Sequence, residues 1–167
     1  MSDFGRAFLD WERDKMRDLS RRTADALAQL SDADINWRPN EESNSIENLV
    51  LHLVGNIQQR VVAGIQGLPD LRDRDAEFNT RDVMTRDQAI ALVQEWFGLA
   101  ADTMGQLPVA RLFDPLEVQS QQTTVHAVIN TVVTHAAEHV GQMLYIAKLR
   151  LGSEFKGLSM QHKKALP

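Results

Sequence analysis

Large apolar residues recur every three to five positions in four long stretches of the chain, which is the spacing of amphipathic helices. The stretches run from Asp3 to Leu30, from Asn44 to about Gly67, from Thr85 to Leu107 and from about Val125 to Leu151. The apolar positions that define them are Phe4, Phe8, Trp11, Met16, Leu19, Ala26, Leu27 and Leu30; Ile46, Leu49, Val50, Leu53, Ile57, Val61 and Ile65; Ile90, Val93, Phe97, Ala100, Met104 and Leu107; and Val128, Val132, Ile146 and Leu149. With no strand pattern and no repeat, they predict an all-α four-helix bundle.

Polar residues at the helix starts predict where three of these helices begin. Asn44 with Glu47, and Thr85 with Gln88, have the three-residue spacing of a capping box. Thr123 or Thr124 can cap the last helix. Glycines mark two ends, with Gly67 followed by Leu68-Pro69, and Gly152 followed by Ser153.

The segments between the helices differ in composition. The segment 31–43 is polar and predicts a loop whose Trp37 folds back onto the bundle. The segment 70–84 is dense in charges and predicts a solvated crossover, whereas 108–124 predicts a turn-rich connection. We expect a partly mobile tail from about residue 153.

Length and composition restrict the class of protein. A chain of 167 residues predicts one domain over residues 1–167. The net charge of -5, without a clustered basic face, argues against nucleic acid and anionic membranes as partners. The absence of cysteine excludes disulfides, thiolate zinc sites and a cysteine nucleophile. No signal-peptide pattern opens the sequence and no stretch approaches 18 apolar residues, so we expect a cytoplasmic protein.

Three histidines form the candidate metal site. His135 and His139 stand four apart, which places both imidazoles on one helix face, within an apolar stripe. His52 lies at the edge of the apolar stripe of the second helix and can lean into the bundle. Three neutral imidazoles make an open site with a coordination position left for water or substrate. The alternative for each histidine alone is a hydrogen-bonded core residue.

Four polar residues near these histidines are candidate participants in the site. Arg60 projects towards the apolar stripe, so we expect either an ion pair with a partner such as Glu77 or a contact with a substrate anion. Gln142 lies one turn after His139 and either hydrogen-bonds metal-bound water or is a plain polar core residue. Asn56 lies one turn after His52, on the same side of the helix. Glu138 is expected near the ligands or in solvent, and the catalytic groups stay unassigned.

Two other metal sites fit the sequence poorly. Residues 135–139 match the His-x-x-Glu-His pattern of inverted zinc peptidases, but such enzymes need another acidic ligand well downstream. Glu154 is the only carboxylate side chain after His139. A ferritin-like di-iron site needs a Glu three residues before a ligand histidine, and none stands there.

The fragments Ser45–Asn56 and His135–Gln142 together resemble the DinB-like (DNA-damage-inducible, YfiT-like) metal-binding four-helix bundles. Gly55-Asn56 with Arg60 and residues 74–78 resemble one bacterial branch of that superfamily, for which the resemblance implies no firm activity. The resemblance implies an up-down-down-up bundle and a zinc or nickel ion on His52, His135 and His139. It also implies a homodimer, and in some relatives the use of small thiols such as bacillithiol or mycothiol.

A second apolar face on the fourth helix also suggests a dimer. Ile129, Val133, Val140 and Leu144 point away from His135, and a four-helix bundle covers one face of each helix. We therefore expect either a two-fold contact or burial against the C-terminal tail. His126 belongs to this outer face and is not expected at the metal.

The candidate site predicts chemistry on a small molecule. A divalent ion on three neutral ligands keeps its full charge, so it lowers the pKa of bound water towards about 7 or stabilises a bound thiolate. The chain has no thiol of its own, and the family that it resembles includes thiol-dependent transferases. The first hypothesis is therefore a thiol-dependent S-transferase that takes a low-molecular-weight thiol as cosubstrate. A metal-dependent hydrolase is the close alternative. A non-catalytic metal- or ligand-binding stress-response protein is the hypothesis from another class.

Overall fold

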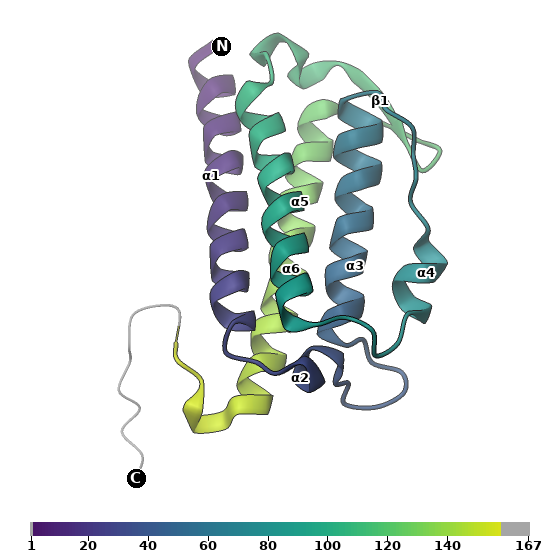
Figure 1. The fold of residues 1–167 in the computed structure, drawn as a ribbon. Helices are drawn as coiled ribbons and strands as arrows, with labels where there is room; N and C mark the ends of the chain where they lie inside the picture. Colours follow the sequence, from purple (N-terminus) through teal and green to yellow (C-terminus); the bar gives the residue numbers. More distant parts are fainter. Residues whose placement is uncertain (1, 158–167) are drawn as a thin grey trace.

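The computed structural model describes residues 2–157, most of which lie in four long helices (Figure 1). These are α1 (Ser2–Leu27), α3 (Ile46–Ile57) with its continuation η1 (Gln58–Ile65), α5 (Arg86–Gln106) and α6 (Val125–Leu151). In Figure 1, α1 and α6 run in one direction and α3 and α5 in the other. α1 is therefore antiparallel to α3, and α5 is antiparallel to α6. In the packing, α1 and α3 each contact both α5 and α6. The predicted up-down-down-up bundle is confirmed.

Shorter elements join the long helices: α2 (Asp32–Asn36), α4 (Arg74–Asn79), η2 (Val109–Phe113), β1 (Pro115–Val118), β2 (Gln121–Thr124) and η3 (Gly152–Glu154). The hairpin of β1 and β2 corrects the prediction of a structure without strands. Its turn residues Gln119 and Ser120 both have positive φ, 54° and 60°, as in the two-residue turns that match the twist of paired strands. Each strand has four residues, and the sequence of β2 is wholly polar, so hydrophobic alternation does not reveal the pair.

The helix caps agree with the sequence at two of three predicted positions. Thr85 and Gln88 form a capping box before α5, and the side chain of Thr124 caps α6. The predicted Asn44 cap of α3 is wrong by one residue, because Ser45 and Asn48 form the capping box there. Glu47 is consequently free for another role, and its fully buried carboxylate accepts hydrogen bonds from the backbone N–H groups of residues 82, 83 and 84 at 3.0, 3.1 and 3.0 Å.

The second half of the long helix formed by α3 and η1 is wound as a π-helix, from Gln58 to Ile65. In this winding each N–H bonds the carbonyl five residues back, so a turn holds more residues than an α-helical turn. Ile57, Val61 and Ile65 recur every four residues and are all buried. The wider turn keeps these three apolar side chains on the core side of the helix. It also changes the direction in which the polar side chains between them leave the helix.

The apolar core confirms most of the predicted stripes, with exceptions at the start of α1 and at Leu149 near the end of α6, which is 53% exposed. Phe4 and Trp11 were expected in the stripe but are 79% and 72% exposed. Leu9 and Met16, seven residues apart, are completely buried and define the inner face there instead. Trp37 packs against the core as predicted, and the guanidinium of Arg150 lies 5.0 Å from the centre of its ring.

The second apolar face of α6 is buried inside the chain. Ile129, Val133 and Val140 are 0%, 4% and 1% exposed, because α6 packs against both α1 and α3. The argument that this face needs a partner subunit or the C-terminal tail is therefore wrong, and the expected homodimer stays a prediction from the family resemblance. Most of the predicted mobile tail, residues 158–167, lies outside the described residues. Within residues 2–157, no helix is long and apolar enough to cross a membrane.

Candidate metal centre

Three histidine rings from two helices meet in the bundle. His52 comes from α3, and His135 and His139 come from one face of α6. The ring centres lie 5.0, 5.0 and 4.4 Å apart, and one nitrogen of each ring lies within 4.8 Å of the other two. His52 is buried, whereas His135 and His139 are partly exposed. The three residues that the sequence singled out are therefore in contact, and the cluster has an open side.

A carboxylate fixes the orientation of the His52 ring. Glu77 Oε2 lies 2.9 Å from His52 Nδ1, which leaves Nε2 to face the other two histidines. His52 Nε2 lies 2.9 Å from His135 Nε2. Two ligands of one ion have a similar separation, roughly 3.4 Å when each metal–nitrogen bond is about 2.1 Å. A carboxylate behind a ligating histidine is a common arrangement in metal sites, because it sets the tautomer and makes the ligand more basic.

Arg72 neutralises this carboxylate. Its Nε donates to Glu77 Oε1 at 2.7 Å and its Nη2 donates to Glu77 Oε2 at 2.9 Å, so the pair is bidentate. The side chains of Arg72 and Glu77 are only 4% and 5% exposed. The prediction that residues 70–84 form a solvated crossover is wrong for these two residues. A run of charges usually lies in solvent, so the composition gave no signal for a buried pair.

Polar residues at the start of α3 hold the crossover in place. Asn48 Nδ2 donates to the backbone carbonyls of Glu77 and Thr80, at 3.0 Å each. The carboxylate of Glu47 accepts the hydrogen bonds from the backbone N–H groups of residues 82–84. These bonds tie α4 and its following loop to α3, which brings Glu77 beside His52.

Gly55 makes room for the ion pair. A Cβ atom placed on Gly55 would overlap Glu77 Oε1 and would lie 2.8 Å from Glu77 Cδ and 3.2 Å from Arg72 Nε. Gly55 is one turn from His52 on the same helix. The close approach of the crossover to α3 therefore depends on the missing side chain.

The other candidates from the sequence take different positions. Gln142 Oε1 lies 3.0 Å from His139 Nδ1, so Gln142 contacts a candidate ligand directly. Glu138 is 73% exposed, and its carboxylate is 3.9 Å from His135 Nδ1, beyond hydrogen-bond distance. Asn56 is buried. His126 stacks between Phe8 and Phe113, with ring centres 4.6 and 6.1 Å away, and is not part of the cluster, as predicted.

Arg60 does not pair with Glu77, which corrects the first of the two roles expected for it. Glu77 is paired with Arg72 instead. Arg60 Nε is buried and has no hydrogen-bond partner among residues 2–157. Burial, followed by the positive charge of Arg72, lowers the pKa of Arg60.

Burial also favours the neutral form of two of the histidines, His52 and His135. It is the largest cause that lowers the pKa of His135 to about 4, followed by the positive charges of His139, His52, Arg60 and Arg72. Burial likewise lowers the pKa of His52, against the hydrogen bond to Glu77, which raises it. Neutral imidazole is the form that binds a metal ion. The donor set, its spacing and its protonation are thus consistent with a site for one divalent ion.

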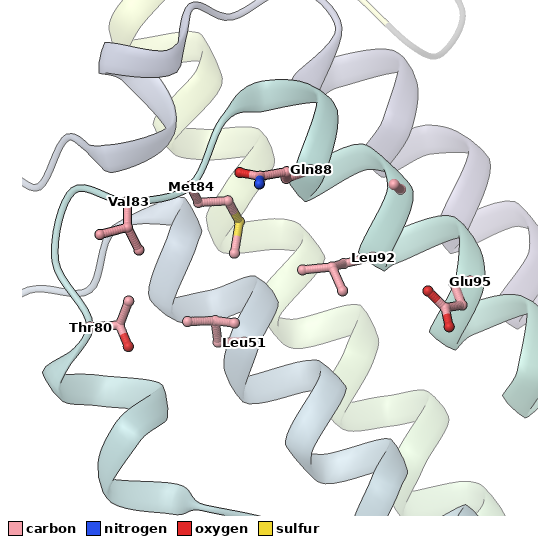
Figure 2. A pocket seen from close by; sticks show the side chains of 8 residues that line it. Leu51, Thr80, Val83, Met84, Gln88, Leu92 and Glu95 are labelled. Atoms are coloured by element: carbon pink, nitrogen blue, oxygen red, sulfur yellow. The ribbon is translucent and has the colours of Figure 1, made fainter.

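Two hollows lie along α3, next to the segment 70–84 and α5. One, of about 500 Å³, lies between α3, α5 and the loop before α5, where the side chains of Leu51, Met84 and Leu92 meet (Figure 2). The next, of about 380 Å³, shares Leu51 and is lined by Arg72 and Glu77. Neither hollow is lined by a histidine of the cluster. Glu77 lines the second hollow and also contacts His52, so it connects that hollow to the cluster.

Comparisons with known proteins agree with this fold. A sequence model of the family described as "Protein of unknown function (DUF1572)" matches residues 3–164. No curated protein matches the sequence. Among solved structures, a DinB-like protein from Bacillus cereus ATCC 10987 is similar over 84% of this chain and 91% of that chain, with a TM-score of 0.64 and 13% sequence identity. At that identity the likeness concerns the fold, which is the DinB-like fold expected from the sequence.

Proposed function

The chain belongs to the family described as "Protein of unknown function (DUF1572)", and we propose that it is a metal-dependent enzyme whose single divalent ion is held by His52, His135 and His139. The observation that carries this proposal is the convergence of one nitrogen from each ring to within 4.8 Å. Glu77 and Gln142 support it, because each engages the Nδ1 atom of one ring and leaves the other nitrogen for the ion.

The number of ligands favours a catalytic ion over a structural one. In the described part of the chain, the group of neighbouring ligand residues has three members. Structural zinc sites are usually closed by four protein ligands, whereas catalytic sites keep a position for a reactant. The partial exposure of His135 and His139 gives that position access from solvent. Zinc and nickel both suit imidazole ligands.

The reaction that we propose is the transfer of a small thiol to an electrophilic small molecule. A divalent ion bound here would favour the thiolate form of that thiol at neutral pH. The protein contributes neutral histidines, an ordered ring at His52 and a partly exposed side for the two substrates. The lack of cysteine supports an external thiol, because the chain has no sulfur nucleophile. A cytoplasmic location, where such thiols are reduced, remains part of the proposal.

Metal analysis tests the first half of the proposal. Purified protein is expected to hold about one zinc or nickel ion per chain, and His135→Ala is expected to lose it while retaining helical circular dichroism. His126→Ala is the matched control, because His126 lies on α6 outside the cluster and should leave the metal content unchanged. Full metal occupancy in His135→Ala would exclude the three-histidine site.

A screen of thiols against a chromogenic aryl halide tests the second half. In the expected reaction the thiolate sulfur bonds the ring carbon, the carbon–halogen bond breaks, and halide and a proton are released. The rate should depend on both the metal and the thiol and should fall to background in His135→Ala. Metal-dependent hydrolysis of esters without any thiol would instead favour the hydrolase, and a metal-bound protein that is inert in both assays would favour a binding protein.

A further inference from the structure

We propose that Arg60 binds a carboxylate or phosphate group of the small molecule that reaches the metal centre. This inference rests on the proposed function, because it takes the three histidines to be where the reactive end of that molecule is held. It adds a substrate class, namely a small molecule with an oxyanion group.

Arg60 is half-buried, and its Nε is a buried donor without an acceptor among residues 2–157. Its guanidinium also has no ion pair within residues 2–157. Leaving such a group unpaired is costly, because a charged donor loses its hydration on burial. The other buried side-chain atoms without a partner in residues 2–157 belong to Arg6, Asn36, Arg38 and Gln58. Arg60 is the one of these five residues whose charge acts on His135, and an unpaired donor beside a candidate site points to a ligand.

Glu77, the carboxylate of the cluster, is not its partner. Both oxygens of Glu77 accept hydrogen bonds from Arg72, and Oε2 also contacts His52 Nδ1. Arg72 also places a second positive charge close enough to lower the pKa of Arg60. Residues 2–157 thus supply no acceptor for Arg60 Nε, and a bound oxyanion would supply one.

The winding of the helix places Arg60 on the same side as His52. His52, Asn56 and Arg60 are spaced four apart, and in an α-helix such a row drifts by about 40° at each step. Arg60 lies in the π-helical segment 58–65, where each residue turns less, so the drift between Asn56 and Arg60 is smaller. Arg60 therefore lies two turns from the candidate ligand, and its charge acts on His135 across the gap between the helices.

The charges of the site favour an anionic ligand. Arg72 and Glu77 cancel each other, and the three imidazoles are neutral ligands. A divalent ion together with Arg60 leaves the site with an excess of positive charge. The guanidinium fork matches carboxylate and phosphate oxygens in two parallel hydrogen bonds, which makes an oxyanion the fitting ligand.

Thermal unfolding with added anions tests the inference. The midpoint of unfolding is measured at constant ionic strength with increasing acetate in one arm and inorganic phosphate in the other, on zinc-loaded protein and on protein with a chelator. We expect at least one anion to raise the wild-type midpoint in a saturable way, and the rise to be lost in Arg60→Gln. Arg17→Gln removes an exposed arginine paired with Asp102 and should retain the rise.

One further measurement makes the result decisive. The Nε–H resonance of Arg60, assigned by its loss in Arg60→Lys, should shift on adding the same anion. An anion effect that persists in full in Arg60→Gln, or that is absent for both anions while zinc still binds, would overturn the inference. If the protein binds no metal but the Arg60-dependent rise remains in chelator, the anion site stands and the proposed metal function fails.

Discussion

Glu77 Oε2 and His52 Nδ1 lie 2.9 Å apart, although 25 residues separate them in the chain. The contact joins the crossover to α3 and leaves His52 Nε2 directed at His135. One buried carboxylate thereby controls the direction of a candidate metal ligand, which makes Glu77 a sensitive point for substitution.

Replacing Glu77 with glutamine should weaken metal binding by about 10- to 100-fold, as loss of a partner behind a ligating histidine typically does. It also leaves Arg72 buried without its counter-ion, so the free energy of unfolding should fall by about 3 kcal/mol. Calorimetric zinc titration and urea unfolding measure the two effects. Glu138→Gln is the control, since that exposed carboxylate lies beyond hydrogen-bond distance of His135 and should change zinc affinity less than about twofold. Equal affinities for Glu77→Gln and wild type would contradict the orienting role.

Gly55→Ala should disturb the same contact from the helix side. The added methyl group would overlap Glu77 Oε1, so the Glu77–Arg72 pair must move away from His52. We expect a loss of stability of about 1–3 kcal/mol and weaker zinc binding. Gly98→Ala is a matched helical control, because a Cβ there meets nothing within 4 Å, and it should keep or raise stability by up to about 1 kcal/mol. Similar behaviour of the two variants would show that Gly55 is not needed for the close approach.

The stability of the metal-free protein should fall as the pH drops from 6.5 towards 4. In the folded protein the pKa of His135 is about 4, well below its ordinary value of 6.5, mainly because of burial. Between these values the unfolded chain binds more protons, so acid favours unfolding, and above pH 6.5 the contribution is fully present. His135 alone accounts for at most about 3 kcal/mol. Urea unfolding in chelator at pH 7 and pH 4.5 should show a smaller decline for His135→Gln, since the acidic residues titrate in both proteins; an equal decline would refute this role.

Zinc should be lost over the same acidic range, because protons compete for the imidazole nitrogens that bind the ion. The pKa of His135, lowered to about 4, and the lowered pKa of His52 predict that this competition is weak at pH 7 and grows as the pH falls towards about 4. Equilibrium dialysis against zinc buffers at several pH values measures it. Affinity that stays constant to below pH 4 would argue against imidazole ligands.

Glu47 should contribute strongly to stability although it lies outside the cluster. Its buried carboxylate accepts three backbone N–H groups of residues 82–84, and removing it leaves all three without an acceptor. We expect Glu47→Ala to lower the free energy of unfolding by about 2–4 kcal/mol. Exposed Glu42→Ala is the control and should change it by less than about 0.5 kcal/mol. Faster hydrogen exchange of residues 82–84 in Glu47→Ala would locate the effect.

The sequence was sufficient for the parts of the fold that depend on local pattern. Apolar spacing and the Thr85 and Thr124 caps gave the long helices, and the four-residue spacing of His135 and His139 placed two rings together. His52 followed from its place at the edge of a stripe and from the DinB-like resemblance. These features depend on residues one or two turns apart, which sequence periodicity records directly.

The sequence was insufficient where a residue's role depends on a distant segment. Arg72 and Glu77 stand in a run of charges that reads as solvated, and only the docking of residues 70–84 on α3 buries them. For the same reason the partner of Arg60 was assigned incorrectly. The π-helix has no residue signature, and the Ser45 cap differs from the expected one by a single position. The single domain, the homodimer and the identity of the metal stay predictions.

The return path between α3 and α5 has a consequence for how such a protein diversifies. Because these helices run parallel, the chain must travel back along the bundle before α5 begins, and this external segment carries Glu77 (Figure 1). The residue that tunes His52 is thus encoded apart from the helices that supply the rings. Exchange of residues 70–84 between relatives would change the environment of His52 and would leave the packing of the four long helices unchanged.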